Sequence, residues 1–441
     1  MLLILPLLAI FQLRLREFYL IVVCFILIGL AYGMDRPLDE YIVEGLNRGA
    51  FLAGFILLMA LLREGAMTSN SILAAGKFLT NQPPNRRFFS IFAGSHFFSV
   101  LINFGALSLL SPIIQRGVRA TASSTEPLDE ISQIKERRQL SASLRGYAWF
   151  LVWAPTAVSQ AVMPTLIDGI DGLKLMLTGL CLALLMMFVN WLEDSLRWRS
   201  FAKRLRAQGP PRPRSDTIFP ITAFRNIGLL SASLFGLSIC LSMTQGVSLV
   251  IGVMLASPIV VIIWVFVQNQ WHNGKTAPVS ASAKRLREIS FNSLPSYIRE
   301  TIFIACAGFI GTLAAKLMPV GAMAEALNIA QMAPWLFLWC LSIAVLLLGQ
   351  IGLSPITMAV FLGSIIAELP ILPVEPTWAA LGIVSGTAIC SMGAPFAGGI
   401  LMLSRATGYS SFTLSWRWNG LATLISTMVL APVFWLLTNY F

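Results

Sequence analysis

Polar side chains that could bind an ion or a small solute gather at four places where apolar segments of this chain are interrupted. A helix broken inside an apolar region leaves N–H groups that attract anions and carbonyl groups that can bind a cation. The two interruptions in the N-terminal half offer Asn103, Gly105, Ser108, Pro155, Thr156, Ser159 and Gln160. The two in the C-terminal half offer Gln350, Ser354, Pro355, Thr357, Ser391 and Pro395. We expect these residues to form one binding site.

The candidates differ in how strongly they point to a ligand. A single Ser or Thr in a membrane helix bundle often caps a helix or helps two helices pack. Asn103, Gln160 and Gln350 carry amides that are costlier to bury, so they are the stronger candidates. His96, seven residues before Asn103, could carry a proton near neutral pH; the alternative is a neutral histidine hydrogen-bonded within the bundle.

Residues for metal binding or covalent chemistry are scarce. The chain has two histidines, and its six cysteines lack metal-ligand spacing, so we predict no metal site, no catalytic residues and no cofactor. All twenty Asp and Glu residues fall in predicted loops or at span ends, which argues against a carboxylate proton carrier at the membrane centre. Because residues for metal binding and covalent chemistry are scarce, an enzyme is not expected. Na⁺ is a candidate coupling ion.

The elements that must position these residues are membrane helices. The 441 residues are 56% hydrophobic and 12% charged, with a mean hydropathy of +0.77. This charged fraction is about half that of soluble domains. The net charge of +11 lies in a few loops between apolar runs, as the positive-inside rule predicts for a multi-pass protein of the cytoplasmic (inner) membrane. Membrane lipid is thus the expected partner, and nucleic acid is not.

We predict ten spans, at residues 1–12, 18–33, 46–63, 146–167, 172–192, 219–243, 246–267, 300–318, 378–404 and 418–438. The basic loops 116–145, 193–218 and 268–299 should be cytoplasmic, and the acidic loops 34–45 and 368–377 external. The sides of the membrane assigned to these loops are mutually consistent only if two apolar runs each enter the membrane and leave it again on the same side. We assign 88–115 as a re-entrant hairpin from the cytoplasmic side and 333–367 as one from the external side.

Landmarks recur in the same order in the two halves. Gly65-Ala66-Met67 returns as Gly321-Ala322-Met323, and Ala154-Pro155-Thr156-Ala157 returns as Ala394-Pro395-Phe396-Ala397. Each half would hold five spans and one hairpin, and because five is odd the second copy must be inverted. The fold class is therefore an all-α polytopic membrane protein with two inverted repeats, at 1–192 and 219–441, joined by a basic cytoplasmic linker at 193–218.

The broken elements resemble those of the ion transporter superfamily. Leu101-Ile102-Asn103-Phe104-Gly105-Ala106 and Leu353-Ser354-Pro355-Ile356-Thr357 are similar to the Ser-Asn-Thr-like hairpin tips of divalent-anion/sodium symporters, although neither motif is complete. The Ala-Pro turns look like that group's Thr-Pro-Pro-Asn-like turn. The superfamily also includes arsenite permease-like proteins and tripartite carboxylate transporter membrane subunits. The resemblance implies Na⁺ sites and a substrate carboxylate held at the tips and turns.

These observations predict a secondary active transporter of a small, anionic solute, coupled to Na⁺ or H⁺, with a homodimer as one assembly to consider. An exporter of an inorganic oxyanion or metabolite is the second transporter hypothesis. A membrane subunit that needs a partner, such as an extracytoplasmic binding protein, is another. A lipid- or glycan-handling enzyme would need charged cavity residues and long external loops, which the sequence does not show.

Overall fold

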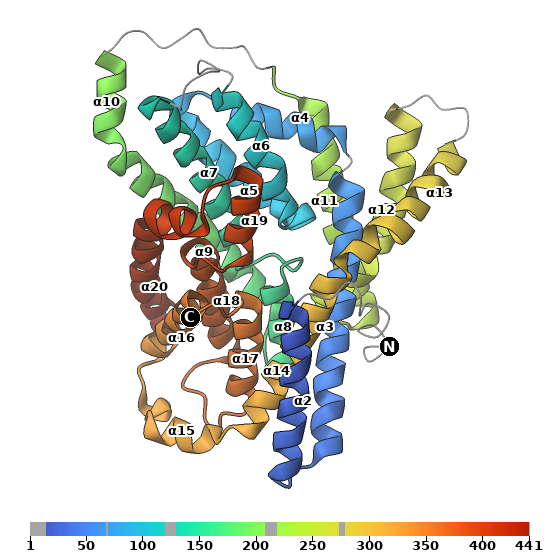
Figure 1. The fold of residues 1–441 in the computed structure, drawn as a ribbon, viewed down its shortest axis with the longest axis vertical. Coiled ribbons are helices and arrows are strands. Elements are labelled where there is room, and N and C mark those ends of the chain that lie inside the picture. Colours follow the sequence, from blue (N-terminus) through green and yellow to red (C-terminus); the bar gives the residue numbers. More distant parts are fainter. Residues whose placement is uncertain (1–14, 68, 120–128, 208–217, 273–277, 441) are drawn as a thin grey trace.

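The computed structural model of this chain describes residues 15–67, 69–119, 129–207, 218–272 and 278–440. The described part is all-α and is the fold of a polytopic membrane protein (Figure 1). The predicted span 1–12 lies outside the described residues, as do parts of the basic loops. The helices of the N-terminal half are α2 (Leu15–Gly33), α3 (Leu38–Met67), α4 (Asn70–Thr80), α5 (Pro84–Ile102), α6 (Gly105–Arg119), α7 (Glu130–Phe150), α8 (Val158–Leu166), α9 (Gly172–Arg197) and α10 (Arg199–Ala207).

The C-terminal half has the same kinds of elements. It contains α11 (Ile221–Gln245), α12 (Leu249–His272), α13 (Pro278–Glu288), η2 (Ile289–Ser293), η3 (Leu294–Tyr297), α14 (Ile298–Leu317), α15 (Val320–Ala326), η4 (Ile329–Gln331), α16 (Pro334–Gln350), α17 (Pro355–Ala367), α18 (Pro376–Gly393), α19 (Gly398–Thr407), η5 (Thr413–Asn419) and α20 (Gly420–Tyr440). Two long helices, α3 and α14, lie side by side near the centre of the molecule (Figure 1).

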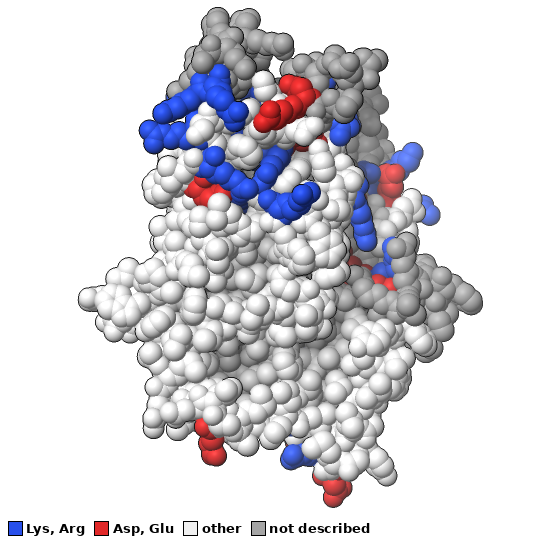
Figure 2. Space-filling model, turned by 60° about the vertical axis from the view of Figure 1, so that its left-hand side comes forward, with Lys and Arg blue, Asp and Glu red and all other residues white. Residues whose placement is uncertain are grey.

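Helix length and hydropathy fit a membrane. Seven described segments are long and apolar enough to span one, and they coincide with predicted spans: Leu38–Met67, Gly172–Arg197, Ile221–Gln245, Leu249–Gln270, Val279–Leu317, Pro376–Thr407 and Thr413–Tyr440. Lys and Arg side chains gather at one end of the molecule, while much of the middle of the visible face carries no charge (Figure 2). The α2–α3 connection lies at the opposite end (Figure 1).

All four predicted interruptions are breaks between helices. The segment predicted as the first hairpin corresponds to α5 and α6, which are separated at residues 103–104 and together extend a few residues beyond the predicted 88–115. The second consists of α16 and α17 and matches the predicted 333–367 closely. The Ala-Pro turns separate α7 from α8 and α18 from α19.

Three predictions need correction. Residues 130–145 were expected in a loop, but they form the first part of α7, and Glu136 and Arg145 on it are buried. The linker expected at 193–218 is helical through Ala207, because α9 runs to Arg197 and α10 follows. The loop expected at 268–299 is helical from Pro278 to Tyr297, in α13, η2 and η3. Glu136 of α7 is buried, as are Glu193 and Asp194, which lie at the end of α9 as predicted for a span end. Their charges are compensated by partners that lie far away in the sequence, as described below.

Candidate functional site

Asn103 ends the first hairpin leg in a conformation that few residues other than glycine adopt. Its φ is 46° and its ψ is −124°, the geometry of the first central position of a type II′ turn. Its N–H donates to the Ser99 carbonyl at 2.8 Å. Its side-chain oxygen Oδ1 is buried without a hydrogen-bond partner in the protein. A strained backbone and an unpaired buried acceptor at one residue are features that cluster at binding sites.

The next residue, Phe104, joins the first tip to the second Ala-Pro turn. Its ring lies 5.2 Å from the Tyr147 ring, centroid to centroid. A Cβ added at Gly398, the first residue of α19, would come within 3.0 Å of Phe104 Cζ. A Cβ at Gly399 would be only 2.6 Å from Tyr147 Cε1. The two glycines therefore let α19 approach the tip, because any larger residue would collide with these rings.

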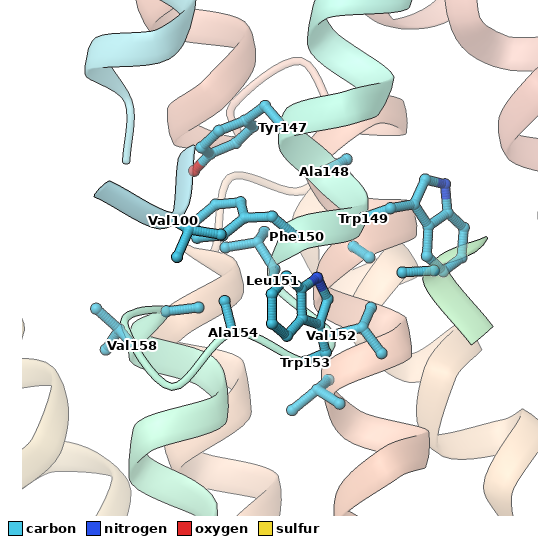
Figure 3. Close-up of a cluster of buried hydrophobic side chains, with 14 of the residues drawn as sticks. Val100, Tyr147, Ala148, Trp149, Phe150, Leu151, Val152, Trp153, Ala154 and Val158 are labelled. Atoms are coloured by element: carbon cyan, nitrogen blue, oxygen red, sulfur yellow. The ribbon is translucent and has the colours of Figure 1, made fainter. Parts of the chain in front are cut away.

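The first Ala-Pro turn also lies beside this tip. Val100, three residues before Asn103, is grouped with Phe150, Ala154 and Val158 in one buried cluster (Figure 3). Thr156 and Gln160 follow the turn and are 3% and 4% exposed. Thr156 Oγ1 and Gln160 Oε1 have no hydrogen-bond partner in the protein, whereas the Ser159 hydroxyl donates to the Leu151 carbonyl at 3.1 Å. Two further unpaired oxygens are thus buried at the first Ala-Pro turn.

The second tip contacts the second Ala-Pro turn but is more open. Gln350 donates from Nε2 to the Gly393 carbonyl at 3.4 Å, and its Oε1 accepts from Trp416 Nε1 at 2.9 Å. A Cβ at Gly352 would be 3.9 Å from the Phe396 ring. Ser354 and Thr357 are half-buried, and Ile351 at the tip is 73% exposed. Ser391 is buried on α18, one turn before Pro395.

The remaining predicted residues have structural places near these breaks. Gly105 begins α6 and Pro355 is the first residue of α17, which its fixed φ suits. Pro155 and Pro395 are buried within their turns. The Ser108 hydroxyl faces the carbonyl of Phe104, the residue before α6, at 3.4 Å, which is a weak contact. The structure thus connects both tips to the second turn, and it places Val100, just before the first tip, beside the first turn (Figure 3).

The two Ala-Pro turns share one backbone hydrogen-bond pattern. The N–H of Ala154 bonds to the Phe150 carbonyl at 3.1 Å, and that of Ala394 bonds to the Cys390 carbonyl at 2.9 Å. The N–H of Ala157 then bonds to Ala154, and that of Ala397 to Ala394. Neither α8 nor α19 has a side-chain cap at its N-terminus. Both turns therefore present uncapped helix starts, which carry partial positive charge.

His96 is held as a neutral side chain by its two ring nitrogens. Trp153 Nε1, which can only donate, bonds to His96 Nε2 at 2.8 Å, so Nε2 carries no proton. Nδ1 lies 3.1 Å from the Gly146 carbonyl and must then be the protonated nitrogen. Protonating Nε2 would break the bond to Trp153. This geometry favours the structural alternative for His96 over a proton carrier.

A charged cluster that sequence reasoning missed lies at the α3–α14 contact near the first tip. Arg63 Nε is buried without a partner, 3.4 Å from where a Cβ of Gly105 would lie. The Arg63 guanidinium sits 5.4 Å above the Tyr297 ring, and the Tyr297 hydroxyl donates to Glu64 Oε1 at 2.6 Å. Arg63 and Glu300 both lie close enough to the Tyr147 phenol to interact with it electrostatically. Arg63 is thus the cation nearest to the first hairpin tip among the described contacts.

The opposite end of the α3–α14 pair has a similar arrangement. The Lys316 ammonium lies 5.1 Å above the Tyr41 ring and pairs with Glu44 at 2.9 Å and with Glu368 of α17 at 3.6 Å. Tyr41-Ile42 and Glu44 open α3, as Tyr297-Ile298 and Glu300 open α14. The two copies of this motif are separated in the sequence by the same number of residues as the two Gly-Ala-Met motifs. This recurrence could have pointed to the charged cluster from the sequence alone.

A second missed group, the buried charge network, joins α7 to α9 and η5. Arg145 pairs with Glu193 at 2.7 Å, with both side chains 3% exposed, and donates from Nε to Asn419 Oδ1 at 2.8 Å. Arg138 pairs with Asp194 at 2.6 Å. On the hairpin side, Gln115 donates to Glu136 Oε1 at 2.8 Å. This network compensates the buried carboxylates and connects the two halves of the chain.

The fold is similar to those of two solved membrane transporters. The Alcanivorax borkumensis YdaH transporter matches with a TM-score of 0.58 and 13% identity, over 95% of this chain and 98% of that chain. Neisseria gonorrhoeae MtrF, described with a class of antimetabolite efflux pumps, matches with a TM-score of 0.60 and 13% identity, over 97% and 96%. No family model and no curated protein sequence matches this chain.

Both neighbours are transporters rather than enzymes, and neither is one of the symporter, arsenite permease-like or tripartite transporter groups that the sequence motifs resembled. That part of the resemblance is corrected: it rested on short, incomplete motifs, whereas the arrangement of the whole chain matches these two structures. This chain has a membrane transporter fold.

Proposed function

We propose that this protein is a secondary active transporter of a small anionic solute, with its binding site where the first hairpin tip meets the two Ala-Pro turns. The observation that carries the proposal is the set of three buried oxygens without protein partners, on Asn103, Thr156 and Gln160. Leaving such groups unpaired costs about 1–3 kcal/mol each. A site that is filled by an ion, water or a solute during transport removes this cost.

The chemistry of these groups suits an anion together with a coupling cation. Amide and hydroxyl oxygens are hard ligands of the kind that bind Na⁺, and the uncapped starts of α8 and α19 can hold an anion through backbone N–H groups. Na⁺ is favoured over H⁺ as the coupling ion because His96 already uses both ring nitrogens. Arg63, beside Gly105, adds a positive charge close to the first tip.

Two inverted repeats would explain why breaks at corresponding positions of the two halves lie close together. An inverted repeat is supported by the two Ala-Pro turns, which share a hydrogen-bond pattern, and by the motifs that begin α3 and α14. It is also supported by the antiparallel α3–α14 contact, in which Lys316 reaches Tyr41 and Arg63 reaches Tyr297. In such folds one part of each repeat moves against the other to give alternating access.

The decisive experiment uses the purified chain alone. Thermal unfolding is first measured across a panel of small organic and inorganic anions, with and without Na⁺, because a ligand of the native state raises the apparent stability. The anion with the largest shift is then tested for uptake into liposomes under a Na⁺ gradient and, separately, a pH gradient. We expect Na⁺-dependent binding and uptake. A chain that binds no anion, or that moves none without another protein, contradicts the proposal and favours a partner-dependent subunit.

Export is the second candidate, and the shared fold with MtrF, an efflux pump, is the observation that favours it. The direction follows from the same liposomes. Solute trapped inside and released under an inward-directed ion gradient would indicate antiport and export. Solute that accumulates inside under that gradient would indicate symport.

A further inference from the structure

A cavity of about 470 Å³ opens beside α7, away from the four breaks. It is lined by Gln133, Ile134 and Arg137 of α7, by Tyr409 before η5, and by Trp418 of η5. Its size falls in the range of about 300–1,000 Å³ that small-ligand sites occupy. Helix α7 and the segment after α19 lie near the end of the molecule where Lys and Arg side chains gather (Figures 1 and 2).

Arg137 gives this cavity an uncompensated positive charge. One of its N–H groups donates to the Arg417 carbonyl at 2.8 Å, and a guanidinium has five such donors. Within the described part of the chain, no ion pair joins Arg137 or Arg417 to a carboxylate. The carboxylate that acts on Arg137, Glu193, is already paired with Arg145 at 2.7 Å and with Arg197 at 3.4 Å. The carboxylate of Glu136, which contacts Tyr409, accepts from Gln115 at 2.8 Å.

The charges around Arg137 are mainly of its own sign. Arg197, Arg145 and Arg417 act on it electrostatically, against a single carboxylate, Glu193. Like charges held this close destabilise the protein unless an anion or solvent compensates them. An arginine kept in such surroundings, with free donors directed at a cavity, is the usual arrangement for binding an oxyanion.

Aromatic side chains fix the geometry of this arginine. The Arg137 guanidinium lies 5.3 Å from the Trp198 ring centroid and 6.0 Å from that of Trp418, and Trp418 lies 4.7 Å from Tyr409. Burial and the neighbouring Glu136 carboxylate, to which the Tyr409 hydroxyl hydrogen-bonds, raise the pKa of the Tyr409 phenol, so it stays protonated and uncharged. The cavity therefore combines an arginine, a phenol and an apolar wall at the basic end of the molecule.

We propose that this cavity is a binding site for a phosphate-bearing anion, held by the guanidinium of Arg137 and distinct from the transport site. A phosphate group has several acceptor oxygens that match the fork of an arginine. Trp and Tyr commonly sit at the headgroup level of a membrane, where anionic lipids on the cytoplasmic side present such phosphates. A soluble phosphate compound offers the same chemistry, so the test separates the two sources.

The test uses the full chain in nanodiscs of phosphatidylcholine, with or without phosphatidylglycerol. Thermal unfolding is followed while either the anionic lipid or inorganic phosphate is added, against chloride at equal ionic strength. We expect a concentration-dependent rise in melting temperature with one of these ligands. A rise with phosphatidylglycerol identifies a lipid headgroup, and a rise with inorganic phosphate in pure phosphatidylcholine identifies a soluble ligand. No rise with either overturns the proposal.

Variants test whether Arg137 carries the binding. Arg137→Gln should weaken the apparent affinity about 10- to 100-fold, as the loss of a charge-assisted contact does. Arg137→Lys keeps the charge without the fork and should weaken it less; this variant decides the matter if Arg137→Gln folds poorly. Arg285→Gln is the matched control, because it removes one half-buried arginine, away from the cavity, whose ion pair is with Glu288 at 2.9 Å. Equal losses in Arg137→Gln and Arg285→Gln would show nonspecific attraction and refute the site.

Discussion

Replacing Asn103 by glycine should make the protein more stable and a poorer transporter. The backbone at Asn103, with φ 46° and ψ −124°, is one that glycine adopts freely. Alanine would be a poor choice, because it keeps the steric conflict of a Cβ at this φ. Glycine also removes Oδ1, the buried oxygen that has no partner in the protein.

The expected gain is the balance of three contributions. Relief of the backbone strain is worth about 1–3 kcal/mol. Removal of an unpaired buried acceptor is worth about 1–3 kcal/mol. Glycine makes the unfolded chain more flexible, which costs about 0.5–1 kcal/mol, and the lost side chain also gives up some packing. We therefore expect a net stabilisation of about 1 kcal/mol or more, seen as a melting temperature raised by about 1 °C or more.

The assay compares Asn103→Gly with Asn328→Gly in the absence and presence of the best anion from the panel. Asn328 also has a positive φ, of 49°, but it lies in an exposed turn, in the left-handed region that asparagine tolerates, and its amide bonds only to Gln331. The control should therefore keep its stability within about 0.5 kcal/mol and should bind and transport normally. Asn103→Gly should lose most of the anion- or Na⁺-dependent stabilisation.

Two results would refute this reasoning. If Asn103→Gly is less stable than the parent, then Asn103 makes an interaction that outweighs its strain. If it is more stable but still binds and transports as the parent does, then its Oδ1 is not part of the binding site. The second result would leave the fold intact while removing the main support for the proposed site.

Three further predictions concern other parts of the molecule. His96→Gln should leave the pH profile of uptake unchanged, because both ring nitrogens are occupied; a shifted profile would make His96 a proton carrier. Arg145→Met should destabilise the protein by about 3–5 kcal/mol in thermal unfolding, since Glu193 and Asn419 would lose a buried partner; a loss below about 1 kcal/mol would mean that water already reaches them. Ile371 and Val279 are 62% and 69% exposed, so each can be replaced by a single cysteine in a chain whose native cysteines have been removed. The two cysteines should be labelled from opposite sides of the membrane. Labelling of both from the same side would contradict the topology.

The positions of the breaks could be predicted from the sequence because they depend on local signals. Proline removes a backbone donor, and glycine permits the turns that end a helix, so Gly349 to Pro355 and the two Ala-Pro turns were visible within apolar runs. The boundaries of the second hairpin agree with the prediction closely for this reason. Apolar length likewise indicated most of the spans.

The buried part of α7 could not be predicted in the same way. Residues 130–145 are rich in Glu, Lys, Arg and Gln, and such a segment is read as a solvated loop. In the structure its charges meet partners from α9 and η5, about 50 and more than 270 residues away: Arg138 meets Asp194, and Arg145 meets Glu193 and Asn419. Only the helix start had a local signal, since Asp129 caps it by accepting from the Ser132 N–H.

The two hairpin tips are built alike but are not equally covered. The first lies against Tyr147 and α19, whereas Ile351 of the second is 73% exposed and Phe396 beside it is 43% exposed. Two exact inverted copies in identical surroundings would expose both tips equally. Unequal exposure is what a single state of an alternating-access transporter requires, because a site open to both sides at once would leak. The first tip is covered by α19, which approaches it at Gly398 and Gly399. At the second tip, Gln350 is contacted by Trp416 through a hydrogen bond. Each tip thus contacts the second Ala-Pro turn region through a small number of residues. If the protein transports as we propose, a shift of these contacts would exchange which tip is covered without unfolding either helix pair.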